Sequence, residues 1–239
     1  MPCPVLIASL WLWACPHAAA ADHAPATAAR TVHFKTPDGW TLAARYRAPR
    51  LGRPVVILVH GVAAGKDEWA PLEAELERRG VGSLAVDLRG HGESLRGPAG
   101  DTDFRGFDAA GEWPKAAKDI AAATAFLQRQ GIAPSRVGYL GASIGANLVS
   151  RAQPRPRWLA LLSPGIDYRG VRLARAPDGL PVMVAASPSD AYALRTAADY
   201  ASLRPATVFL RARQGHGAQM LSDREFMDRL LDWIERGGR

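Results

Sequence analysis

Two patterns of apolar positions alternate along most of this chain. Short continuous runs of β-branched and other apolar residues predict strands that are buried on both faces. Longer stretches with apolar residues at helical spacing, each closed by glycine or by polar residues, predict amphipathic helices. The expected strands are 54–59, 81–86, 136–140, 158–162, 181–186 and 207–211, and the expected helices are 69–79, 116–130, 192–203 and 223–236. Such alternation predicts an α/β fold with a mostly parallel sheet and helices on both faces.

A different pattern precedes the first buried run. Residues 31–35 and 40–46 are two strand-like segments that flank Thr36-Pro37-Asp38-Gly39. Asp-Gly is a strong signal for a tight hairpin turn. We therefore expect an N-terminal antiparallel hairpin at the start of a single domain that covers residues 31–239.

The first twenty residues have the pattern of an export signal. The apolar run from Val5 to Trp13 ends in small residues, Ala18 to Ala21, and it is too short to span a bilayer as a mature helix. We expect residues 1–20 to be a signal peptide and residues 21–30 to be a flexible arm. The mature protein would then be periplasmic or extracellular, with no stable membrane insertion.

The two cysteines, Cys3 and Cys15, both lie in this leader. Cleavage near Ala20 would leave a mature chain with no thiol, which excludes a disulfide scaffold, a zinc-thiolate site and a cysteine nucleophile. The segment Leu12 to Cys15 also resembles a bacterial lipoprotein box, although Trp13 fits that box poorly. A lipid anchor on Cys15 is therefore the alternative form of the exported protein.

Composition adds few constraints. Hydrophobic residues make up 48% of the chain and charged residues 22%, the balance of a globular protein. The formal net charge is +7, but the basic residues are spread out and form no long run. We read this charge as a solvated surface and expect no nucleic-acid partner. The sequence does not determine an oligomeric state.

One short motif carries chemistry of its own. Gly141-Ala142-Ser143-Ile144-Gly145 follows an expected strand and precedes a helical stretch, which is the pattern of a nucleophile elbow. A serine on so tight a turn projects its hydroxyl from the sheet edge, and glycine is needed two positions before and after it because the backbone passes close by. The N–H of Ile144, at the helix start, can face a developing oxyanion.

Further motifs occur in a fixed order along the chain. His60-Gly61, Asp87-Leu88-Arg89-Gly90-His91-Gly92, the elbow and Gly215-His216-Gly217 together resemble the landmarks of the α/β-hydrolase superfamily, from about residue 31 to the C-terminus. The closer resemblance is to small members without a lid, of the dienelactone-hydrolase and carboxylesterase type. It implies that His60 and His91 are structural and that Val62 supplies a second oxyanion N–H.

The resemblance also implies the order serine, acid, histidine. His216 is the only histidine after Ser143, and it is therefore the expected base. Asp190 follows the strand at 181–186, the usual place for the acid, whereas Asp167 follows the preceding strand, as in some lipase relatives. Asp178 lies before a strand and so at the wrong end of the sheet. We favour Asp190 and keep Asp167 as the alternative.

These residues imply a serine hydrolase that cleaves small carboxylic esters through an acyl-enzyme, with no cofactor and no metal. A thioesterase, an amidase or peptidase, and a non-catalytic binding protein of the same fold remain alternatives. We expect no large helical cap over the site, because residues 163–179 contain prolines and glycines, which break helices, and arginines, which favour a solvated loop. Phe104, Phe107 and Trp113 could line the pocket or pack under a long loop.

Overall fold

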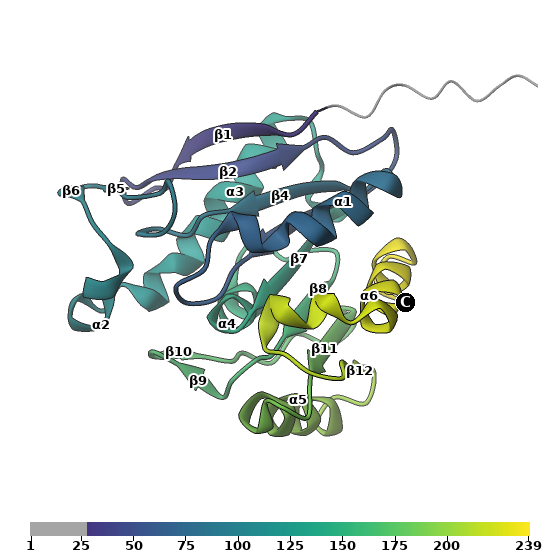
Figure 1. The fold of residues 1–239 in the computed structure, drawn as a ribbon. Coiled ribbons are helices and arrows are strands. Elements are labelled where there is room, and N and C mark those ends of the chain that lie inside the picture. The colour runs from purple at the N-terminus through teal and green to yellow at the C-terminus, as the bar shows by residue number, and fades with distance from the viewer. Residues whose placement is uncertain (1–27) are drawn as a thin grey trace, which may run out of the picture.

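A sheet of eight strands forms the centre of the molecule in a computed structural model, which describes residues 28–239 (Figure 1). The spatial order is β1-β2-β4-β3-β7-β8-β11-β12. The strands are β1 Arg30–Lys35, β2 Thr41–Arg47, β3 Val55–Val59, β4 Gly82–Val86, β7 Val137–Ala142, β8 Leu159–Leu162, β11 Val182–Ala186 and β12 Val208–Arg211. The expected signal peptide and both cysteines lie outside the described residues.

The N-terminal hairpin forms one edge of this sheet. Strands β1 and β2 pair antiparallel, and β2 pairs antiparallel with β4. Gly39 lies in the connecting turn with φ 94°, a conformation that residues with a side chain rarely adopt. From β4 to β12 every neighbouring pair is parallel, as the continuous apolar runs predict. The first strand begins at Arg30, the last residue of the arm expected from the sequence.

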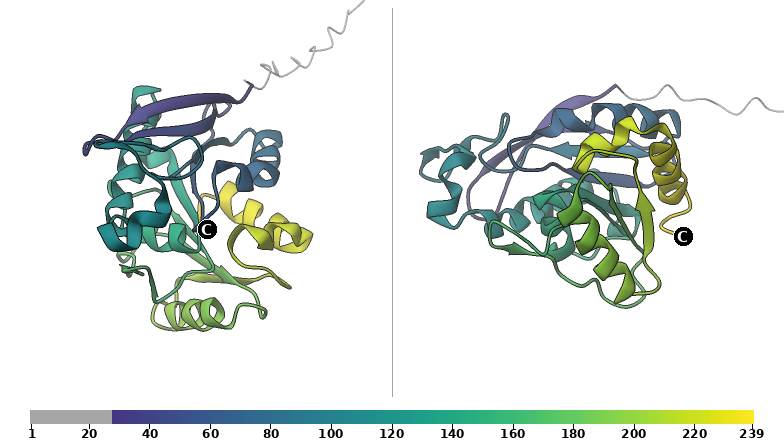
Figure 2. Two further views of the ribbon diagram at one scale, coloured as in Figure 1. Left: turned by 60° about the vertical axis from the view of Figure 1, so that its left-hand side comes forward. Right: turned by 60° about the horizontal axis from the view of Figure 1, so that its bottom comes forward.

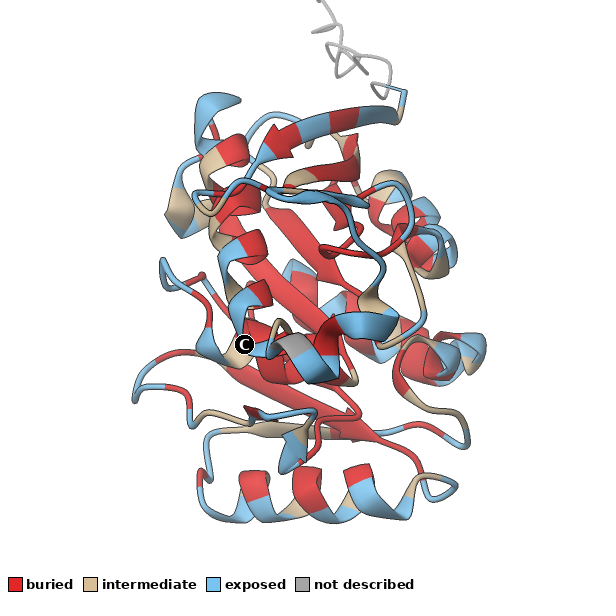
Figure 3. Cartoon of the chain, turned by 90° about the vertical axis from the view of Figure 1, so that its left-hand side faces the viewer, coloured by how far each residue is buried: buried red, intermediate tan, exposed pale blue. Residues whose placement is uncertain are grey.

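Helices cover both faces of the sheet (Figure 2). One apolar core lies between the sheet and α3, α4 and α5, and the other lies between the sheet and α1 and α6. Figure 3 shows the buried strands between helices whose outer faces are exposed. These helices are α1 Ala70–Arg78, α3 Ala117–Arg129, α4 Ile144–Arg151, α5 Ala191–Ser202 and α6 Arg224–Glu235. Within residues 28–239, no helix combines the length and apolar character needed to cross a membrane.

The expected absence of a large cap agrees with the structure. Between β8 and β11 the chain forms only a two-stranded hairpin, β9 Asp167–Tyr168 and β10 Val171–Arg172. The buried side chain of Asn147 on α4 holds this hairpin, because its Nδ2 donates to the carbonyls of Gly165 and Val171 at 2.8 and 2.7 Å. The sequence predicted this segment as a loop and missed the hairpin.

The long connection after β4 contains short elements and an aromatic cluster. Phe107 and Trp113 are buried and meet edge to face at 5.4 Å, and the ring of His91 stacks on Phe104 at 4.2 Å. Packing under a long loop is therefore the interpretation that the structure supports for Phe107 and Trp113. The short elements are β5 Arg96–Gly97, β6 Gly100–Asp101, the 3₁₀ helix η2 Phe104–Gly106, α2 Phe107–Ala110 and η3 Trp113–Ala116.

Candidate active site

The sequence-predicted residues meet at the carboxyl ends of the parallel strands. Ser143 follows β7, Asp190 follows β11, and His216 lies five residues after the end of β12. Because parallel strands all end at the same edge of a sheet, loops far apart in sequence converge there. Open α/β sheets bind their ligands at this edge.

Ser143 occupies a strained turn between β7 and α4. Its backbone has φ 56° and ψ −125°, a region that residues with a side chain rarely populate. A Cβ at Gly141 would lie 2.2 Å from the carbonyl oxygen of Gly145, and a Cβ at Gly145 would lie 2.3 Å from the carbonyl oxygen of Val59. Both glycines are therefore required by close backbone approach. The turn leaves Ser143 partly exposed at the sheet edge.

His216 is held by Asp190. The distance from Nδ1 of His216 to Oδ2 of Asp190 is 2.6 Å, and the histidine side chain is 42% exposed while that of the aspartate is 14% exposed. An ionised Asp190 places the proton on Nδ1, which leaves the lone pair of Nε2 free to accept another. An imidazole held in this way can act as a general base.

Three serines fix the backbone on both sides of His216. Ser187 Oγ donates to the carbonyl of Gly215 at 2.6 Å, and Ser189 Oγ accepts from the N–H of Gly215 at 3.0 Å. On the other side, the N–H of Gly217 donates to Ser163 Oγ at 2.9 Å. Sequence reasoning missed these three residues, because a serine in a loop carries no signal until its partner is known.

The loop after β3 approaches Ser143 closely. A Cβ at Gly61 would lie 3.2 Å from the Cβ of Ser143. The next residues form a tight turn in which Ala63 has φ 58° and the N–H of Ala64 donates to the carbonyl of Gly61 at 3.4 Å. Val62 lies in this turn, and Ile144 is the first residue of α4, whose opening N–H groups have no partner within the helix. One proposed oxyanion donor therefore belongs to a loop that adjoins Ser143, and the other belongs to the helix that begins directly after it.

Glu68 fixes the same loop from the short helix η1, Lys66–Trp69. Its Oε1 accepts from the N–H of Gly61 at 3.3 Å. Burial raises the pKa of this carboxyl to about 7, and the Gly61 hydrogen bond opposes that rise. Sequence reasoning also missed Glu68.

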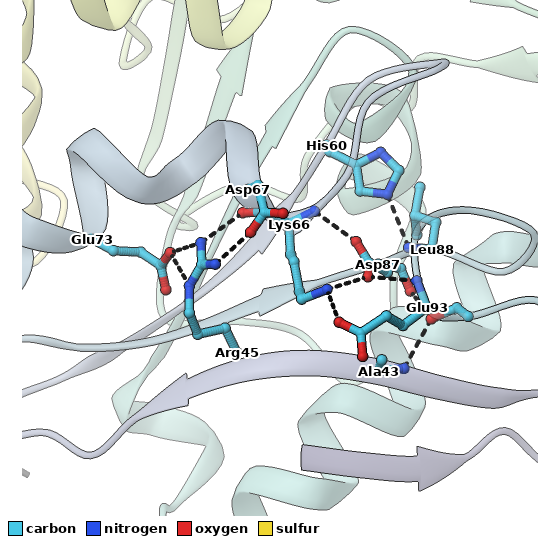
Figure 4. Close-up of polar contacts among 10 residues, drawn as sticks. Ala43, Arg45, His60, Lys66, Asp67, Glu73, Asp87, Leu88 and Glu93 are labelled. Carbon is cyan, nitrogen blue, oxygen red and sulfur yellow. Dashed lines mark hydrogen bonds and ion pairs between the residues drawn. The ribbon is translucent and has the colours of Figure 1, made fainter. Parts of the chain in front are cut away.

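A buried carboxylate joins the loops after β3 and β4 (Figure 4). Oδ1 of Asp87 accepts from the backbone N–H of Lys66 at 2.7 Å, and Oδ2 accepts from the Lys66 ammonium at 2.7 Å and from the N–H of Glu93 at 3.0 Å. A Cβ at Gly92 would lie 2.3 Å from this carboxylate. The Asp-x-x-x-x-Gly spacing therefore serves to bind two loops to each other.

His60 is part of the same framework. Its Nε2 accepts from the N–H of Leu88 at 3.0 Å, so the proton lies on Nδ1, which donates to the carbonyl of Gly61 at 2.7 Å. Burial lowers the pKa of His60 to about 4, and His91, whose ring centroid is 4.8 Å away, acts in the same direction. Both imidazole nitrogens are thus occupied, which fits a structural role for a neutral His60.

Tyr168 on β9 is a further residue at the site that the sequence did not reveal. Its ring meets the imidazole of His216 edge to face at 6.4 Å, and its hydroxyl donates to the carbonyl of Ser163 at 3.4 Å. Its nearest sequence signal is Gly165, where a Cβ would lie 2.6 Å from the Tyr168 ring. A glycine three residues before a tyrosine is too common in proteins to have indicated that Tyr168 lies at the site.

The other acid candidates lie elsewhere. Oδ1 of Asp167 accepts from the N–H of Gly170 at 2.8 Å and so closes the β9–β10 turn, while Asp178 is exposed before β11. Across residues 28–239 no group of three or more His, Cys, Asp or Glu side chains is arranged to hold a metal ion.

Comparison with known proteins agrees with this architecture. Residues 56–237 match the model of the alpha/beta hydrolase family. A polyketide transferase of Stachybotrys chlorohalonatus, ATR5, is 32% identical over 117 residues, which are 48% of this chain and 36% of that protein. The chain thus matches only about a third of the length of this curated relative.

Solved structures share the fold at low identity. An esterase of Pyrococcus furiosus, Pf2001, superposes with a TM-score of 0.66 at 17% identity, over 89% of this chain and 94% of the esterase. A predicted CIB-like hydrolase of Thermoplasma acidophilum superposes with a TM-score of 0.67 at 17% identity, over 87% of this chain and 99% of that protein. On the family match and this shared fold, the chain belongs to the alpha/beta hydrolase family.

Proposed function

We propose that this protein is a serine hydrolase that cleaves carboxylic esters of small substrates. The observation that carries the proposal is the 2.6 Å contact between His216 Nδ1 and Asp190 Oδ2. The loop that carries His216 packs on the nucleophile elbow. At Gly217, the next residue, an added Cβ would lie 3.1 Å from the Cβ of Ala142, beside Ser143. A histidine with no role beyond solvent contact would need neither the Asp190 carboxylate nor this packing against the elbow.

The reaction proceeds in two halves. Nε2 of His216 takes the hydroxyl proton of Ser143 as the serine oxygen attacks the ester carbonyl. The N–H groups of Val62 and Ile144 stabilise the negative oxygen of the tetrahedral intermediate. His216 then protonates the departing alcohol, and a water molecule repeats the sequence on the acyl-enzyme. Asp190 orients the imidazole and stabilises its charged form, and no cofactor or metal takes part.

A fluorophosphonate probe tests the nucleophile directly. The wild-type protein should be labelled at Ser143, and Ser143→Ala should abolish both labelling and ester hydrolysis, with a loss of several orders of magnitude in rate. Ser150→Ala is a matched control on the same helix, α4, and should remain labelled. Labelling that persists in Ser143→Ala would show that Ser143 is not the nucleophile.

A panel of substrates tests which type of bond the protein cleaves and which acyl length it prefers. Esters, thioesters and amides of graded acyl length would separate an esterase from a thioesterase or an amidase, and failure on all three with no labelling would favour a non-catalytic binding protein. The similarity to a polyketide transferase supports one further candidate, transfer of the acyl group to an alcohol instead of water. New ester products in the presence of added alcohols would reveal it.

We also propose that the protein is exported, either free or anchored through a lipid on Cys15. Support comes from the apolar leader and the absence of cysteine after residue 15. The intact mass of the exported protein tests this. A mass that matches a chain beginning near Ala21 supports the free form. A mass that matches a chain beginning at Cys15 with diacylglycerol attached supports the anchored form, and the mass of the uncleaved chain contradicts both.

A further inference from the structure

We propose that Tyr168 is a further catalytic residue, whose phenol O–H donates a hydrogen bond to the leaving-group oxygen as the ester bond breaks. This inference rests on the proposed ester hydrolysis and names a participant that the triad and the two oxyanion amides do not include.

The first support is the position of Tyr168. Its ring lies edge to face with His216, at 6.4 Å and an interplanar angle of 85°. Its hydroxyl donates to the carbonyl of Ser163 at 3.4 Å, a long hydrogen bond that a better acceptor can replace. The phenol therefore lies beside the base, and the Ser143 hydroxyl is near enough to lower the pKa of Tyr168. Its approach requires glycine at position 165, because a Cβ there would lie 2.6 Å from the Tyr168 ring and 2.7 Å from that of Tyr192.

The second support is that the ring is held in place. Tyr192, in the first turn of α5, packs edge to face against Tyr168 at 5.7 Å. The hydroxyl of Tyr192 accepts from the N–H of Asp167 and donates to its carbonyl, both at 3.1 Å. The residue just before Tyr168 is thus fixed from α5, the helix whose N-cap is Asp190. Preorganised donors of this kind are the ones that favour a transition state.

The phenol also keeps its proton under working conditions. Burial raises the pKa of Tyr168 above its usual range, and the Asp190 carboxylate and Tyr192 act in the same direction, while the Ser143 hydroxyl opposes them. A tyrosine with a raised pKa remains a hydrogen-bond donor throughout the range in which a neutral imidazole acts as base.

The geometry indicates which oxygen the phenol meets. The Val62 and Ile144 amides serve the oxyanion, whereas the Tyr168 ring packs against His216, the group that protonates the leaving oxygen. As the carbon–oxygen bond breaks, its electron pair passes to that oxygen, and the proton it gains comes from Nε2 of His216. Tyr168 keeps its own proton and stabilises the charge that builds up before the transfer. An alkoxide gains more from this than a stable aryloxide.

The test compares two leaving groups in two variants. Tyr168→Phe should lower kcat/KM, which reports the acylation half in which the leaving group departs, by about tenfold on ethyl acetate, the effect of one lost hydrogen bond. It should change kcat/KM on 4-nitrophenyl acetate much less. Tyr192→Phe is the matched control, because it loses a hydroxyl that supports the same hairpin without touching Ser143. Any change that it causes should be equal for the two esters.

Each result decides the matter. A fall in Tyr168→Phe that depends on the leaving group supports the inference, provided that Tyr192→Phe shows no such dependence. Equal falls on both esters, or no fall at all, in an active and folded Tyr168→Phe overturn it and leave the proposed function standing. A wild type that cleaves neither ester and takes no fluorophosphonate label overturns the proposed function and this inference with it.

Discussion

Asp190 uses its two carboxylate oxygens for two different tasks, one of which positions His216. Oδ2 lies 2.6 Å from Nδ1 of His216, while Oδ1 caps α5 by accepting from the N–H of Ala193 at 3.2 Å. The cap fixes the carboxylate relative to β11 and α5, so the imidazole is aligned by a group that is itself anchored. A substitution at Asp190 can therefore remove the negative charge beside His216 while the cap on α5 is kept.

We predict that Asp190→Asn folds normally but loses most of its activity. Asparagine is still a good cap for α5, but its amide can favour the wrong imidazole tautomer, which would cut kcat by about 10⁴-fold. Thermal unfolding and ester kinetics measure the two effects separately. Asp167→Asn is the control, since Asp167 contacts the Gly170 N–H and not His216, and it should change kcat much less. The reverse order of effects would place the acid after β8.

The predictions from sequence succeeded where the pattern is local. The elbow glycines at 141 and 145 are required by contacts within one turn and its neighbouring strand, so a five-residue motif is sufficient to identify them. Asp190 was favoured over Asp167 because it follows the strand at 181–186, the usual place for the acid, and the structure has it in contact with His216. The strand and helix ranges likewise follow from runs long enough to show a period.

The features that were missed depend on contacts across the fold. Strand β9 is two residues long, too short for any pattern, and Tyr168 lies beside His216, 48 residues later, only in the folded chain. Ser163 bonds to Gly217, 54 residues later, through an ordinary hydroxyl. Glu68 resembles a surface residue in a helical stretch, and only the folded β3 loop places its carboxyl at the Gly61 N–H.

We predict that Ser163→Ala lowers activity more than it lowers stability. Ser163 is fully buried, and its Oγ accepts the N–H of Gly217, next to His216. Loss of this acceptor leaves a buried N–H unpaired, at a cost of about 1–3 kcal/mol, and releases one side of the histidine loop. The matched control is Ser150→Ala, which removes an acceptor from the N–H of Ala174 at 2.9 Å, away from His216. A similar fall in kcat in both variants would contradict the positioning role.

We predict that Glu68 makes the folded state less stable as the pH rises. Burial raises its pKa from an ordinary value of 4.5 to about 7, so between these values the folded chain holds a proton that the unfolded chain has released. The free energy of unfolding should therefore fall across this range, by at most about 3 kcal/mol. Urea unfolding at pH 5 and pH 8 measures the fall.

The matched variant for this pH dependence is Glu68→Gln, which keeps an acceptor for the Gly61 N–H and cannot titrate. Its free energy of unfolding should fall less than that of the wild type between the two pH values. Glu225→Gln, at a largely exposed position on α6, should keep the wild-type fall. An unchanged pH dependence in Glu68→Gln would show that Glu68 is ionised throughout this range in the folded chain.

The last prediction concerns the cover of the site. The β9–β10 hairpin is tied to α4 through Asn147, and at its tip Arg169 pairs with Asp108 and lies 5.7 Å from the ring centroid of Trp113. No helix stands between β8 and β11 in the described part of the chain, so no helical lid is available there to open at a lipid–water interface. We expect simple saturation kinetics on soluble short-chain esters and weak activity on long-chain triglycerides. Rates measured across the solubility limit of one ester series test this, because a sharp rise at the limit would require a moving cover that this hairpin does not provide.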